Sequence, residues 1–143
     1  EPKLMQLVDN HHTGFVLRSL HAIHSVRQDE TLHEAIRKGF RYYQKLFRPN
    51  GMPITAYGQY PVDIHACAEG ILCNAILSEN MAGAKTLAIK TMRWSWSSMR
   101  DPRSGAPYHR KYPYHTARIV FPRWSVAWMY WAIAEYVGMF KQK

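Results

Sequence analysis

The fold is decided by the stretch from Tyr60 to Gly70, which reads YPVDIHACAEG. Pro61 suits the first turn of a helix, because it lacks an N–H and its φ is already close to helical. Asp63 then falls in that first turn, where the positive end of the helix dipole stabilises a carboxylate. Beyond it, apolar residues recur every three or four positions as far as Ile76. The segment predicts a mostly buried helix, ending near Glu79, whose polar groups gather at its N-terminal end.

Four further helices are predicted from the same spacing of apolar residues. They run from Thr13 to Arg27, from a cap at Asp29 or Thr31 to Phe47, from Ala82 to Met99, and from Arg123 to Phe140. The Tyr-rich and β-branched stretch 108–121 predicts a short β-hairpin or extended arm. The expected fold class is therefore all-α, with helical hairpins and one β-like arm. A chain of 143 residues is long enough to form one such domain with its own core.

Two loops of similar composition indicate an internal repeat. Residues 50–53 read NGMP and residues 104–107 read SGAP, and each loop is followed by a Tyr-Pro pair. The expected helices lie in the same order around both loops. The pattern is that of repeated helical hairpins joined by long aromatic loops.

The composition limits the partners. The formal net charge is +9, which favours anionic ligands such as acidic polysaccharide or nucleic acid. The two cysteines, Cys67 and Cys73, are expected on different faces of one helix, too far apart to bridge. Unpaired thiols indicate a cytoplasmic protein. No apolar run of about 20 residues is present, so no segment is expected to span a membrane.

Asp63 and His65 are the candidate catalytic residues. A carboxyl group or an imidazole at the mouth of an apolar core can act as a general acid or base when burial tunes its pKa. Residues two apart on a helix diverge by about 200°, so the two side chains are not expected to face each other. The alternatives are that Asp63 only caps its helix and that His65 is a buried imidazole bonded to a backbone carbonyl.

No metal or other cofactor is expected. His65, Cys67 and Cys73 do not have the spacing of a zinc site, and their side chains would have to converge from different faces. The stretch 108–115 interleaves tyrosines with His, Arg and Lys. It can stack on sugars and pair with carboxylates, bind single-stranded nucleic acid, or lie in solvent as a plain loop. No known RNA-binding or helix-turn-helix pattern supports the nucleic-acid interpretation.

The segments 12–20 (HTGFVLRSL), 60–70 and 121–129 (FPRWSVAWM) resemble the C-terminal half of six-hairpin (α/α) toroid proteins encoded among bacterial polysaccharide-synthesis genes. More remotely, an acid at a helix start and an Arg-Trp pair on the last inner helix resemble the unsaturated uronyl hydrolases. The resemblance covers nearly the whole chain and implies a partial or half toroid, because a closed ring needs about twice as many helices. The chain is then a fragment of a larger toroid, a stand-alone half ring, or a protomer that completes its core by self-association.

The resemblance implies a carbohydrate-handling protein that binds or processes an acidic or neutral oligosaccharide at the loop ends of the inner helices. Asp63 would be the general acid or base, with His65 beside it. The residues expected to contact the sugar are His12, Tyr57, Tyr60, Arg123 and Trp124. A two-carboxylate glycosidase is not favoured, since only one acid is well placed. Both glycoside hydrolase-like activity and a non-catalytic helical-repeat module for interaction or oligomerisation stay open.

Overall fold

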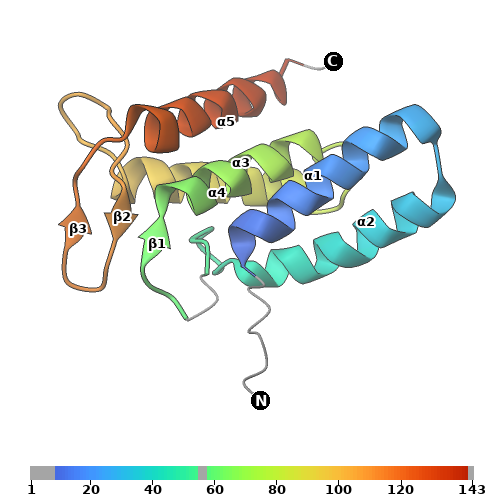
Figure 1. The fold of residues 1–143 in the computed structure, drawn as a ribbon, viewed down its shortest axis with the longest axis horizontal. Coiled ribbons are helices and arrows are strands. Elements are labelled where there is room, and N and C mark those ends of the chain that lie inside the picture. Colours follow the sequence, from blue (N-terminus) through green and yellow to red (C-terminus); the bar gives the residue numbers. More distant parts are fainter. Residues whose placement is uncertain (1–8, 55–57, 142–143) are drawn as a thin grey trace.

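The computed structural model describes residues 9–54 and 58–141, which form five α-helices and a small antiparallel sheet (Figure 1). The helices are α1 (Asn10–Arg27), α2 (Glu30–Tyr43), α3 (Ile64–Ile76), α4 (Ala84–Ser98) and α5 (Ala127–Gly138). A 3₁₀ turn, η1 (Gln44–Leu46), follows α2, and a π-helical turn, η2 (Pro122–Val126), leads into α5. The strands are β1 (Val62–Asp63), β2 (Arg110–Lys111) and β3 (Thr116–Ala117), in that spatial order. The fold is mainly helical, as predicted.

Helix α3 is the centre of the molecule. It packs against α1, α4 and α5, and its residues from Cys67 to Ala75 are all buried. Figure 1 shows α1, α3 and α5 running in one direction, while α2 and α4 return in the other. The N-terminal ends of three helices consequently lie at one end of the bundle. This arrangement positions the candidate site.

The two Gly-Pro loops close in the same way. Phe47 forms an antiparallel bridge with Pro53, and Arg100 forms one with Pro107. The glycine of each loop has positive φ, 89° at Gly51 and 75° at Gly105. The first loop follows the α1–α2 hairpin and the second follows α3–α4, so their geometry agrees with the predicted repeat.

The start of α3 differs from the prediction. Pro61 does not open the helix, because Val62 and Asp63 are extended and pair with Lys111 and Arg110 of β2. Asp63 is the N-cap, with φ −88° and ψ 140°, and its carboxylate accepts a hydrogen bond from the backbone N–H of His65 at 2.9 Å. The helix stops at Ile76, before the predicted end near Glu79.

The other predicted elements are present with shifted ends. Helix α2 changes to a 3₁₀ turn after Tyr43 instead of continuing to Phe47. The predicted arm is confirmed as the β2–β3 hairpin, in which Arg110 pairs with Ala117. No helix in residues 9–54 and 58–141 combines the length and apolarity needed to cross a membrane.

Large apolar side chains remain exposed mainly on α1 and on the segment η2–α5. On α1 they include Phe15, Val16, Ile23 and Val26, and on η2–α5 they include Trp124, Val126, Tyr130, Trp131 and Val137. Helices α2 and α4 expose fewer, Tyr42 and Trp96, and on α2 Glu34 forms ion pairs with Arg37 and Lys38. Exposed apolar patches of this kind mark interaction or ligand-binding surfaces.

Candidate functional site

Histidine and tryptophan side chains meet where the N-terminal ends of α1, α3 and α5 lie together. The ring of His65 on α3 is 3.9 Å from that of His11 on α1, measured between centroids. On its other side, His65 lies 5.0 Å from Trp124 of η2 and 4.5 Å from Trp128 of α5. The structure therefore brings two of the predicted site residues, His65 and Trp124, into contact.

Both imidazoles of this cluster favour the neutral form. Burial, followed by the neighbouring His11, lowers the pKa of His65 from 6.5 to about 4, against a smaller opposing effect of Asp63. Burial, followed by His12, also lowers the pKa of His11. Nε2 of His65 and Nδ1 of His11 are buried and have no hydrogen-bond partner within the described part of the chain. Among residues 9–54 and 58–141, Nε2 of His65 therefore finds no backbone carbonyl of the kind that the sequence left open as an alternative.

The carboxylate of Asp63 joins the β-arm to α3. One oxygen accepts the backbone N–H of His65, and the other accepts Nε of Arg110 at 2.7 Å. His109 Nε2 lies 3.8 Å from the same oxygen. The hydrogen bond to Asp63 is the main cause of a raised pKa for Arg110. Both oxygens of Asp63 already have donors, which is the arrangement of a carboxylate held in place, whether for support or for reaction.

Arg123 and Trp124 stand at a surface pocket. Together with Phe121 and Pro122 they line a cavity of about 280 Å³. Arg123 is exposed and has no hydrogen bond or ion pair with the residues that the structure describes. Its guanidinium is free to pair with a ligand carboxylate. Ser125 fixes the turn below, accepting the N–H of Phe121 at 2.9 Å and donating to its carbonyl at 2.7 Å.

The remaining residues predicted to contact the sugar do not lie together in one place. His12 is exposed, and its Nδ1 lies 2.8 Å from the carboxylate of Asp9, which caps α1. Tyr60 is half-buried and packs against the apolar cluster around α3, so its ring contributes to the core. Tyr57 lies outside the described residues.

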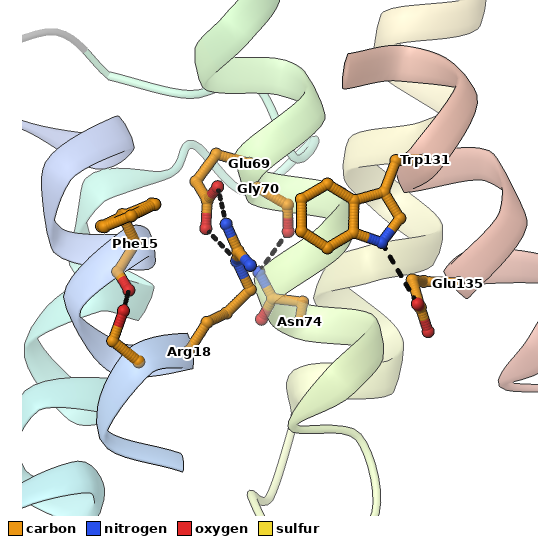
Figure 2. A network of polar contacts seen from close by, with 8 residues as sticks. Phe15, Arg18, Glu69, Gly70, Asn74, Trp131 and Glu135 are labelled. Atoms are coloured by element: carbon orange, nitrogen blue, oxygen red, sulfur yellow. Dashed lines mark hydrogen bonds and ion pairs between the residues drawn. The ribbon is translucent and has the colours of Figure 1, made fainter. Parts of the chain in front are cut away.

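A second layer of polar and aromatic contacts lies further along the same helices (Figure 2). Arg18 donates to the two oxygens of Glu69 at 2.7 and 2.9 Å, and Glu69 is fully buried. The Arg18 guanidinium lies 5.5 Å from the ring of Phe15 and 4.9 Å from that of Trp131. Burial raises the pKa of Glu69, and the hydrogen bond from Arg18 opposes that effect. Glu69 therefore lies inside the bundle.

Gly14 makes room for this buried pair. A Cβ atom at this position would lie 2.6 Å from Oη of Tyr43 and 2.8 Å from Cγ of Glu69. Both distances are shorter than the contacts that real Cβ atoms make, so any side chain here would displace Tyr43 or Glu69.

Sequence reasoning missed several contributors to the site, among them Trp128, Trp131, Arg18 and Arg110. Trp128 and Trp131 follow the predicted Trp124 at i+4 and i+7, a one-face helical pattern that could have indicated a common role. Arg18 and Arg110 gave no such indication, because each meets its acid through tertiary contacts. The pairs are 51 residues apart for Arg18–Glu69 and 47 for Arg110–Asp63.

Within the described ranges, no group of three or more His, Cys, Asp or Glu side chains is placed to hold a metal ion. Cys67 and Cys73 are both buried and unpaired. Comparisons with protein-family models, with curated proteins and with solved structures found no match for this chain.

Proposed function

We propose that the protein handles carbohydrate and binds an acidic oligosaccharide at the end of the bundle where α1, α3 and α5 begin. The single observation that carries this proposal is the pocket beside Trp124, where an unpaired arginine stands next to a half-exposed indole. A tryptophan face suits the apolar face of a sugar ring, and a guanidinium suits a uronate carboxylate.

The charge at this end of the molecule supports an anionic ligand. Three acidic side chains near this end already have basic partners: Asp9 has His12, Asp63 has Arg110 and Glu69 has Arg18. Arg123 keeps its charge available. The N-terminal ends of three helices add positive partial charges, and the whole chain carries +9. A carboxylated sugar would be attracted to this end over a long range.

The proposed role of Asp63 and His65 is to position the ligand, and catalysis by them is a separate claim. Asp63 is the proposed general acid or base, and His65 the residue beside it. Asp63 could act in that way only on a ligand that shares or replaces its contact with Arg110. Binding by Arg123 and Trp124 needs no such rearrangement. Of the two, oligosaccharide binding is therefore the better supported function, and turnover is the further claim.

We place this site in half of an (α/α) toroid. In this proposal the parallel helices α1, α3 and α5 are the inner helices, and α2 and α4 are the outer ones. We also propose a cytoplasmic location. The exposed apolar residues of α1 and α5 lie on the two helices that flank α3. In a ring, further hairpins would cover them. The same exposed residues favour the second candidate function, a non-catalytic helical-repeat module that binds a protein partner or another copy of itself.

A glycan-binding measurement separates these candidates. Wild-type protein should bind uronate-containing oligosaccharides in preference to neutral ones, and binding should weaken as salt rises. Arg123→Gln should reduce uronate binding, while Arg103→Gln, in an exposed turn whose residues do not line the pocket, should not. Absence of uronate preference, together with concentration-dependent self-association in sedimentation, would favour the interaction module.

A further inference from the structure

A continuous row of aromatic contacts leads from the pocket across the molecule to α1. The ring of His65 joins Trp124 to Trp128, at 5.0 and 4.5 Å between centroids, and Trp128 lies 5.6 Å from Trp131. The Arg18 guanidinium then links Trp131 to Phe15 on α1. Three rings of this row are accessible, with exposed fractions of 53% for Trp124, 42% for Trp131 and 50% for Phe15.

In the far part of the row, hydrogen bonds hold Arg18 and Trp131 in place. Figure 2 shows Phe15 and Trp131 on opposite sides of Arg18, whose guanidinium is fixed by its two hydrogen bonds to Glu69. The indole N–H of Trp131 donates to Glu135 at 3.2 Å, which fixes the orientation of the ring. A ligand that stacks here therefore costs little side-chain entropy. Binding of a ligand in the pocket beside Trp124 does not require the rings of Trp131 and Phe15.

The charges near the row indicate which class of ligand it binds. A second copy of the chain would also carry a net charge of +9, so self-association is opposed by repulsion between the two copies. Single-stranded nucleic acid carries a phosphate at every residue and is normally bound by a row of cations. Here Arg18 is neutralised by Glu69, and Arg123 is the unpaired cation beside the described rings. A sparsely charged chain with apolar ring faces fits this row better.

We propose that the row formed by Trp124, Trp131 and Phe15 is an extended binding face for an acidic oligosaccharide several sugars long. Trp124 and Trp131 are seven residues apart, which is about 10 Å along a helix and longer than one sugar ring. Arg123 would pair with a uronate at one end, and the rings of Trp131 and Phe15 would stack on sugars further along. This inference rests on the proposed function and adds to it the length and direction of the ligand.

Calorimetric titration with glucuronic acid and with hyaluronan di-, tetra- and hexasaccharides, in which only every second sugar carries a carboxylate, tests the proposal. The affinity of the wild-type protein should rise with length. Phe15→Ala and Trp131→Ala should each weaken binding of the six-sugar ligand on the order of fivefold and leave binding of the single sugar unchanged. Tyr130→Ala is the matched control, because Tyr130 is 77% exposed on the same helix but makes none of the row's contacts. Circular dichroism of each variant checks the fold, and Phe15→Ala keeps the test valid if Trp131→Ala unfolds.

The outcomes separate the inference from the function on which it rests. Equal affinity for all lengths, with Arg123→Gln still weakening the binding, overturns the extended face and leaves the proposed function intact. No binding at any length overturns both. If oligouridylate binds and competes at this face, or if Phe15→Ala and Trp131→Ala abolish only self-association, the row belongs to nucleic acid or to a second copy, and the proposal is wrong.

Discussion

The carboxylate of Glu69 accepts two hydrogen bonds from the guanidinium of Arg18, at 2.7 and 2.9 Å, beneath the ring of Trp131. The pair joins α1 to the most buried helix of the protein. Burying two charges costs free energy of hydration, which good geometry only partly returns. Removing only one partner should therefore destabilise the protein more than removing both.

The first prediction concerns that pair. Arg18→Met should lower the free energy of unfolding by about 3–5 kcal/mol, because it leaves a buried, uncompensated carboxylate. The double variant Arg18→Met/Glu69→Met should lose less than the single variant does. Urea unfolding of the wild type and the variants measures both quantities. Equal losses in the single and double variants would show that Arg18 acts only through its packing.

The second prediction concerns the space at Gly14. Gly14→Ala should destabilise the protein by about 1–3 kcal/mol, since its Cβ would collide with Tyr43 and Glu69. Gly138→Ala is the matched control, because Gly138 also lies in a helix and a Cβ there meets no atom within 4 Å. The control should be neutral or slightly stabilising, through the better helix propensity of alanine. Thermal unfolding compares the two, and a stable Gly14→Ala variant would contradict the tight fit.

The third prediction concerns pH. The pKa of His65 is about 4 in the folded protein and 6.5 when unperturbed. As pH falls, the unfolded chain binds this proton first, so the stability from neutral His65 is full above about pH 6.5 and is lost toward pH 4. His11 should act in the same direction, because its pKa is also lowered.

The measurement is urea unfolding between pH 4 and 7, followed by tryptophan emission. His65→Phe keeps an aromatic ring against Trp124 and Trp128 but cannot titrate, so its stability should depend less on pH than that of the wild type. Val16→Ala, an exposed substitution on α1 that changes no titratable group, is the control and should keep the wild-type slope. Parallel pH profiles for all three proteins would show that His65 does not contribute.

The fourth prediction separates the two roles of Asp63. Asp63→Asn keeps a good N-cap but weakens the contact with Arg110, which is partly exposed, so it should cost only about 0.2–1 kcal/mol. Asp63→Ala also removes the cap and should cost about 1 kcal/mol more. If the protein turns over a uronate substrate, Asp63→Asn should abolish that activity while the circular dichroism spectrum is unchanged. A variant with lowered melting temperature and unaffected turnover would identify Asp63 as a cap alone.

Local patterns were enough to predict the helices and the arm. Apolar spacing of three and four residues located all five helices, and the Tyr-rich stretch located the β2–β3 hairpin. The same patterns misplaced the start of α3, because the extended state of Val62 depends on Lys111, a partner far along the chain. Helix propensity at Pro61 could not reveal that pairing.

The candidate site was predictable to a similar extent. His65 and Trp124 were named from their place at helix heads, and the structure puts their rings in contact. The positions of Arg18 and Arg110 could not be predicted, since their roles come from the packing of α1 on α3 and of the arm on β1. Sequence patterns report the face of an element, while ion pairs between elements depend on the assembled fold.

The pairing of β1 with β2 has a consequence for how the chain folds. Asp63 and Arg110 are 47 residues apart, and α3 and α4 lie between them. Closing a loop of that length costs chain entropy before the strands reward it, so the arm should order late, after the hairpin of α3 and α4 has formed. The arm, with its Asp63–Arg110 ion pair, would then be the last of these elements to form, and the first to open in hydrogen exchange.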